Sequence, residues 1–186
     1  MNSLKRVMTV AKALRILYNI WFVFSIVGAC LCLLSGVCLS VVDSMGLWEN
    51  EELIGMIGDF SDLTGFELGD MDVIVYAAAL SCVLAAILQI LSYRFYRYVE
   101  RVGDPFDRTV ILKMQTLGIV HIGYTLASAA IGSAVTSVFG IAEFSVENEP
   151  ALTLGIVYLL LTFVFSYAAD TRAPKAEPAA EPTVEE

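Results

Sequence analysis

The sequence predicts an all-α protein, a polytopic four-helix transmembrane bundle with a short exported amphipathic segment. Composition is the first reason: 58% of the 186 residues are hydrophobic and 17% are charged, against roughly 45 to 50% apolar and about 25% charged residues in soluble domains. The second reason is the presence of four apolar runs, each long enough to cross a hydrocarbon core, which takes about 20 helical residues. The third is the segregation of the charges, which gather outside these runs.

The four predicted spans divide the chain into a membrane domain, residues 16–169, and two flanking segments. The spans are about 16–42, 73–93, 112–142 and 151–169, and they are separated by an exported loop, 43–72, and a cytoplasmic loop, 94–111. We expect the first span to be retained, because a signal peptide has an apolar core of only about 7 to 15 residues. Residues 1–15 form a basic N-terminus. Residues 170–186 are rich in Pro, Ala and Glu, which predicts a disordered tail.

The basic residues predict the orientation. All 11 Lys and Arg residues lie in the N-terminal segment, around the connection between spans two and three, or in the tail. The 43–72 loop holds nine acidic residues and no basic ones. Because cytoplasmic flanks carry the excess of Lys and Arg, we expect a multi-pass protein of the cell membrane with both termini in the cytoplasm.

The exported loop predicts a short amphipathic helix at the outer membrane surface. Leu53, Ile54 and Ile57 share one helical face, and Trp48 suits an interfacial anchor. Its carboxylates offer an alternative, a bound calcium ion, since hard cations take several oxygen ligands. The spacing matches no EF-hand loop, so we favour a solvated acidic face.

Small residues recur every fourth position in two spans. Such rows let helix backbones approach closely in lipid, where packing drives association. We interpret them as packing faces within the bundle, with a homodimer through one face as the alternative. The rows are Gly28, Cys32, Gly36 and Ser40 in span one and Ser128, Gly132, Thr136 and Gly140 in span three.

The four cysteines lie inside spans one and two and show no Cys-x-x-Cys spacing. Disulfides belong to exported loops, and zinc sites need clustered Cys and His ligands. We therefore interpret the cysteines as small packing residues and expect no metal site and no cofactor. They are Cys30, Cys32, Cys38 and Cys82.

The connection between spans two and three combines a turn with a helix start. Gly103, Asp104 and Pro105 signal a turn, since proline disfavours helical dihedrals in the residue before it. Asp107 suits an N-cap, because its carboxylate can accept hydrogen bonds from the free amides of a first helical turn. We therefore expect the third helix to begin at Arg108.

The turn belongs to the stretch "GDPFDRTVILKMQTLG", and the chain also has four predicted spans and a predicted exported loop between spans one and two. In these features the chain resembles the bacterial membrane proteins of domain of unknown function family 2975. Residues 103–105 and Phe106 match the turn of that family, Asp107 takes the capping place, and Leu117 and Gly118 close the motif. The family has no established activity. Its members are often regarded as neighbours of small helix-turn-helix regulators, so the resemblance implies such a regulator as a candidate partner.

Polar side chains inside spans are costly and are therefore functional candidates. Asn19, Gln89 and Gln115 lie within a turn or two of the basic flanks, and we interpret them as structural groups that bond to one another across helices. His121 lies deeper, about 12 Å beyond Lys113 at the rise of an α-helix. A proton switch is one interpretation of His121. We favour a packed, neutral side chain, because no Asp or Glu lies within a span to act as its partner.

The residues name no reaction. An intramembrane metalloprotease needs acidic and His ligands within its spans, and a proton-coupled transporter needs an embedded carboxylate. Spans without proline or broken half-helices also argue against transport. We therefore expect a non-catalytic integral membrane protein, not an enzyme, with a small transporter or channel-like protein as the alternative.

The expected partners follow from the placement of the cations. The segment from Arg94 to Lys113 is the predicted contact surface at the cytoplasmic face, with anionic membrane lipids as the default partner, since they attract nearby Lys and Arg. A cytoplasmic regulator protein is the second candidate partner. We expect no direct contact with nucleic acid.

Overall fold

The computed structural model describes residues 2–46, 55, 71–140 and 149–172. Within them it has four helices, each long and apolar enough to cross a membrane: α1 (Asn2–Ser44), α3 (Met71–Val102), α4 (Arg108–Phe139) and α5 (Glu149–Arg172). The predicted all-α fold of four transmembrane helices is confirmed, and the chain is a multi-pass membrane protein by the length and composition of its helices. Trp48 and the predicted amphipathic helix around Leu53, Ile54 and Ile57 lie outside the described residues, as do the acidic residues of the 43–72 loop other than Asp43 in α1 and Asp72 in α3.

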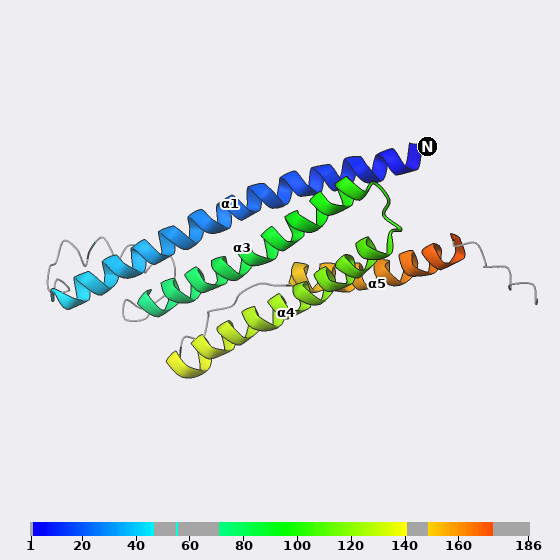
Figure 1. Ribbon diagram of the computed structural model, residues 1–186. Coiled ribbons are helices and arrows are strands. Elements are labelled where there is room, and N and C mark those ends of the chain that lie inside the picture. The colour runs from blue at the N-terminus through cyan, green and yellow to red at the C-terminus, as the bar shows by residue number, and fades with distance from the viewer. Residues whose placement is uncertain (1, 47–54, 56–70, 141–148, 173–186) are drawn as a thin grey trace, which may run out of the picture.

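The helices form two antiparallel pairs, α1 with α3 and α4 with α5, which meet along α3 and α4 (Figure 1). The N-terminal end of α1, the turn between α3 and α4 and the C-terminal end of α5 all lie at the same end of the bundle (Figure 1). We call this the basic end, because the Lys and Arg residues of the described part of the chain all lie here, within residues 2–15, 94–113 and 170–172. The opposite end, formed by the C-terminal turns of α1 and α4 and the start of α3, is the far end.

The helices continue beyond the apolar runs at the basic end. α1 begins at Asn2 rather than near Ile16, and α3 continues past Tyr93 to Val102. At 1.5 Å per residue these extensions are about 21 Å and about 14 Å long. The connection expected at 94–111 is therefore limited to residues 103–107, and residues 170–172, expected in the tail, are helical. Hydropathy marks the part of a helix that lipid surrounds, whereas Arg, Lys, Glu and Tyr also extend a helix until a turn stops it.

Specific backbone signals end and start the helices at the basic end. Gly103 adopts φ +71, which favours glycine, and its N–H donates to the Val99 carbonyl at 3.0 Å, closing α3. Asp107 has extended dihedrals, φ −60 and ψ 133, and its Oδ1 accepts from the amides of Thr109 at 2.8 Å and Val110 at 3.3 Å. Asp107 is thus the N-cap of α4, which begins at Arg108.

The first row of small residues packs inside the molecule. A Cβ added to Gly28 would lie 3.4 Å from Cys82 Sγ, and one added to Gly36 would lie 2.8 Å from Tyr76 Cε1, both on α3. Ser40 Oγ lies 3.2 Å from the Tyr76 hydroxyl. The row therefore faces α3, as the interpretation of intramolecular packing expected.

The second row is divided between the core and the surface. Ser128 is fully buried, whereas Thr136 and Gly140 are exposed near the end of α4. Ser128 Oγ has no hydrogen-bond partner among the described residues. Two turns further along α4, Val135 packs on Ala77 of α3 in a small apolar cluster toward the far end.

Candidate functional site at the basic end

One side chain from each helix meets in a cluster of ionisable groups. Tyr18 of α1 stacks on Tyr96 of α3, with ring centres 5.6 Å apart. The Tyr96 hydroxyl lies 2.5 Å from the hydroxyl of Tyr158 on α5. The ring of His121 on α4 lies 5.2 Å from the ring of Tyr158. We call these four residues the tyrosine–histidine cluster, and they form a continuous row of contacts through the bundle.

The helical period of α3 places Tyr96 in the core. Phe95, Tyr96 and Val99 are buried, whereas Arg97 and Arg101 are exposed. Apolar and aromatic residues at intervals of three and four share one face of a helix, so the alternation of tyrosine and arginine here gives a buried and a solvent-facing side. The same stretch of α3, residues 95–101, thus supplies both the inner aromatic contacts and the outer cations.

His121 is held from two sides. Its Nδ1 lies 2.9 Å from the Leu117 carbonyl, one turn earlier in α4, and the residue is only 1% exposed. Because a carbonyl only accepts, the proton in this bond belongs to Nδ1. On the other side Gly155 brings the α5 backbone close, since a Cβ added there would lie 3.2 Å from the Cβ of His121. The glycine allows the ring of His121 to reach Tyr158.

The cluster offers hydrogen-bonding groups without a carboxylate. Its members are three phenols and one imidazole, and none of their contacts described above is with an acidic side chain. Buried tyrosines are satisfied here by one another, which ties α3 to α5. Within the described ranges no group of three or more His, Cys, Asp or Glu side chains could hold a metal ion. The arrangement is suited to joining helices and to relaying hydrogen bonds.

A cavity of about 320 Å³ lies beside the cluster and involves all four helices. Tyr96 and Tyr158 contribute to its wall, as do Val10 of α1 and Phe165 of α5. Arg6 is the single charged residue among those that line it. The cavity is therefore an apolar space among the four helices, with one cation at the basic end.

The three amide side chains do not form the network that was expected. Asn19 and Gln115 are exposed on the surfaces of α1 and α4, and in the described part of the chain neither forms a hydrogen bond with Gln89. Gln89 is half-buried, and its Oε1 is buried with no partner among the described residues. The expectation was wrong, because distance along a helix gives the depth of a side chain in the membrane but not the direction in which it points.

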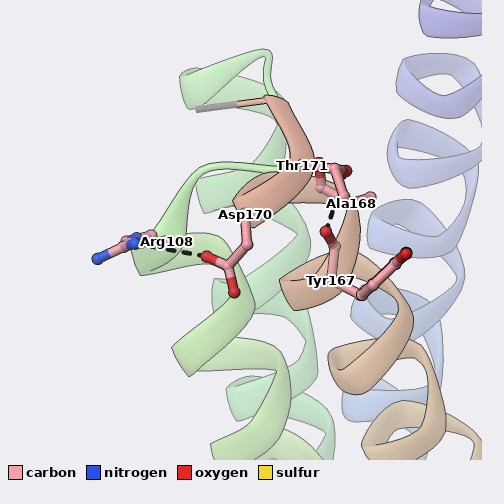
Figure 2. A network of polar contacts seen from close by, with 5 residues as sticks. All are labelled: Arg108, Tyr167, Ala168, Asp170 and Thr171. Atoms are coloured by element: carbon pink, nitrogen blue, oxygen red, sulfur yellow. Dashed lines mark hydrogen bonds and ion pairs between the residues drawn. The ribbon is translucent and has the colours of Figure 1, made fainter. Parts of the chain in front are cut away.

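Two ion pairs tie the helices together at the basic end. Arg15 of α1 pairs with Glu100 of α3, and both side chains are partly buried. Arg108 at the start of α4 points toward Asp170 near the end of α5, with Nη2 and Oδ1 3.4 Å apart (Figure 2). One residue later, the Thr171 hydroxyl bonds back to carbonyls of its own helix (Figure 2). One ion pair joins α1 to α3 and the other joins α4 to α5, so each of the two helix pairs is held together at the basic end.

The turn itself is fastened to α5. The Asp104 carboxylate accepts from the amide of Phe106 at 3.0 Å, and Pro105 is buried. The Phe106 ring lies 5.2 Å from the ring of Phe165 on α5. Because the turn bonds to itself and packs on a neighbouring helix, its residues hold the α3–α4 connection in a defined shape.

Sequence reasoning missed several members of this site. Tyr18 and Tyr158 were not singled out, and neither were the ion-pair acids Glu100 and Asp170. A usable signal was present for the tyrosines, since a phenol in an apolar helix needs a hydrogen-bond partner. The sequence does not show which helix supplies that partner.

Comparison of the chain with protein-family models, with curated proteins and with solved structures finds no match in any of the three.

Proposed function

We propose that this chain is a non-catalytic protein of the cell membrane whose basic end faces the cytoplasm and docks a cytoplasmic regulatory protein. One observation carries the proposal. Arg97 and Arg101 are exposed on α3 at an end of the bundle that is otherwise held together by specific contacts, and neither has a carboxylate partner among the described residues. A fixed backbone with unpaired guanidinium groups is the kind of surface that recognises acidic side chains.

The rigidity of the basic end rests on contacts between all the helices. Ion pairs join α1 to α3 and α4 to α5, and the bonded phenols of Tyr96 and Tyr158 join α3 to α5. The Arg108–Asp170 pair is exposed and contributes at most about 1 kcal/mol. The Arg15–Glu100 pair is less exposed than the Arg108–Asp170 pair and is therefore less weakened by solvent. The buried hydroxyl pair of Tyr96 and Tyr158 adds a third contact that holds α3 in position.

The two arginines act as a pair because of their spacing. Arg97 and Arg101 are four residues apart and so share one face of α3. The nearest acid on that helix, Glu100, is already engaged by Arg15. Preorganised guanidinium groups lose little entropy on binding a carboxylate. The resemblance to family 2975 adds a small helix-turn-helix regulator as the candidate partner.

Orientation is tested by cysteine labelling in a background that lacks the four native cysteines. A cysteine introduced at Gly103 should react with an impermeant maleimide only after the membrane is permeabilised, and one at Asp62 should react in intact cells. The reverse labelling pattern would place the basic end on the outer side of the membrane and would contradict docking of a cytoplasmic protein.

Docking is tested by photo-crosslinking from Val102, beside the two arginines, in native membranes. We expect one identified cytoplasmic protein to be recovered with the wild type, and much less of it with Arg97→Lys/Arg101→Lys, because lysine keeps the charge but not the bidentate geometry. Arg6→Lys, a basic exposed position on α1, is the matched control and should leave recovery unchanged. Equal recovery in the double variant, or none in the wild type, would contradict docking.

A small transporter is the second candidate, favoured by the row of hydroxyl and imidazole groups that runs from the apolar cavity to His121. Proteoliposomes with an entrapped pH-sensitive dye test it. A proton flux that disappears in Tyr158→Phe would support transport over docking. A flux equal to that of empty vesicles would exclude proton transport by the row.

A further inference from the structure

A second cleft, of about 250 Å³, lies between α3 and α4 near the basic end. Two cations line it, Arg94 from α3 and Lys113 from α4, together with the hydroxyl-bearing Thr116. No acidic residue is among its lining residues. The cleft shares only Phe95 with the lining of the cavity beside Arg6, and neither Arg97 nor Arg101 lines it.

The lining changes from charged to apolar with depth. Leu91 lies three residues deeper than Arg94 along α3, and Leu117 and Val120 lie four and seven residues deeper than Lys113 along α4. At the rise of an α-helix these offsets are about 5 Å to about 10 Å. The cations therefore lie at the outer end of the cleft and the aliphatic side chains at the inner end.

The two cations are left without acidic partners by the other contacts of the basic end. Glu100 pairs with Arg15, and Asp170 pairs with Arg108. Lys113 Nζ lies 4.1 Å from the centre of the Tyr98 ring, a cation–π contact that positions the ammonium group without neutralising it. Among the described residues neither Arg94 nor Lys113 has a carboxylate partner.

We propose that this cleft binds one anionic phospholipid, with its phosphate between Arg94 and Lys113 and an acyl chain against Leu91, Leu117 and Val120. Charge complementarity selects an anion, and the aliphatic inner end selects a chain attached to it. A membrane phospholipid presents the two parts in this order, phosphate at the surface and hydrocarbon below. The site is a defined position for one lipid, distinct from the general attraction of basic flanks for an anionic leaflet.

To test this, the full chain is reconstituted in an equimolar mixture of phosphatidylglycerol and phosphatidylcholine and then extracted in mild detergent. Native mass spectrometry identifies and counts the lipids that each protein chain retains. We expect one retained phosphatidylglycerol per wild-type chain. Arg94→Gln/Lys113→Gln should lower the preference for phosphatidylglycerol by about 30-fold, because both cations that contact the phosphate in the cleft are removed. Arg97→Gln/Arg101→Gln removes the same charge at the same end outside the cleft, and should leave the preference nearly unchanged. Equal losses in the two variants would overturn a defined site.

Two further arms test the acyl half of the site. Val120→Phe should fill the inner end and reduce retention with both cations intact, whereas Ile119→Phe, on an exposed neighbouring position of α4, should not. Glycerol phosphate, the headgroup without chains, should fail to displace the bound lipid. Displacement by glycerol phosphate, or equal retention of phosphatidylcholine by the wild type, would overturn the proposal. Circular dichroism and elution volume show whether each variant keeps its fold.

Discussion

The two helices of the α4–α5 pair pack against each other differently from the two helices of the α1–α3 pair. In the α4–α5 pair the backbones touch: a Cβ added to Gly118 would lie 3.0 Å from the Gly155 carbonyl oxygen, and the reverse distance is also 3.0 Å. In the α1–α3 pair the glycines face side chains instead, the ring of Tyr76 at Gly36 and the thiol of Cys82 at Gly28. A side chain can rotate away from an added methyl group, but a helix backbone moves only if the whole helix moves. The importance of a glycine therefore depends on the atom that faces it.

The largest effect is expected from Gly155→Ala. The new Cβ would lie 2.9 Å from a side-chain carbon of Ile122 and 3.0 Å from the Gly118 carbonyl oxygen, so α5 must shift away from α4. Overpacking of this kind costs about 1 to 3 kcal/mol. The measurement is unfolding in mixed micelles with a rising fraction of sodium dodecyl sulfate, followed by circular dichroism.

Gly123→Ala is the matched control for Gly155→Ala. Nothing lies within 4 Å of a Cβ added to Gly123, so alanine should be neutral or stabilise the helix by up to about 1 kcal/mol. If Gly155→Ala and Gly123→Ala unfold at the same fraction of sodium dodecyl sulfate, the backbone contact does not set how closely α4 and α5 pack.

Asp107→Ala is expected to have the next largest effect, because it removes the cap from the first turn of that same α4. Two amides, those of Thr109 and Val110, would lose their acceptor. The expected loss is about 0.5 to 2 kcal/mol, and Asp107→Asn should restore most of it because asparagine also caps well. The same unfolding measurement distinguishes the two variants. A loss in the Asn variant as large as in the Ala variant would contradict the cap.

Gly36→Ala should cost less than about 1 kcal/mol, although its added Cβ would lie closest of all to a neighbour, 2.8 Å from Tyr76 Cε1. The Tyr76 ring is exposed enough to turn aside, at the cost of its contact with Ser40. In a double-mutant cycle, Gly36→Ala should no longer lower the free energy of unfolding when Tyr76→Ala is also present, because the ring that the new methyl group meets is gone. An effect equal to that of Gly155→Ala would mean that α1 and α3 are as constrained as α4 and α5.

Tyr158→Phe is expected to have the smallest effect. It removes the hydroxyl pair with Tyr96 that links the two helix pairs, and such bonds contribute about 0.6 kcal/mol on average in membranes. Tyr167→Phe, at an exposed position of the same helix, is the control and should leave the free energy of unfolding unchanged. Identical unfolding of the two variants would show that the link between the pairs is carried by ring packing alone.

The features that could be predicted from the sequence are local or compositional. Four apolar runs predicted four transmembrane helices because each run must satisfy its own backbone in lipid. The turn at Gly103 and the cap at Asp107 were also readable, since each depends on the dihedral preferences or hydrogen-bonding capacity of a few neighbouring residues. The extensions of α1 and α3 beyond their apolar runs were not, because hydropathy falls before the helix stops.

Only the tertiary structure decided which side chains meet. A row of small residues in span one was visible through its four-residue period, whereas Gly118 and Gly155, each alone at the crossing of its helix, gave no periodic signal. In the same way Asn19, Gln89 and Gln115 were placed at similar depth, but the rotation of each helix directs them apart. The tyrosine–histidine cluster takes one residue from each of four helices. Sequence fixes the depth of a residue along its own helix, and the packing of one helix on another fixes the direction it faces.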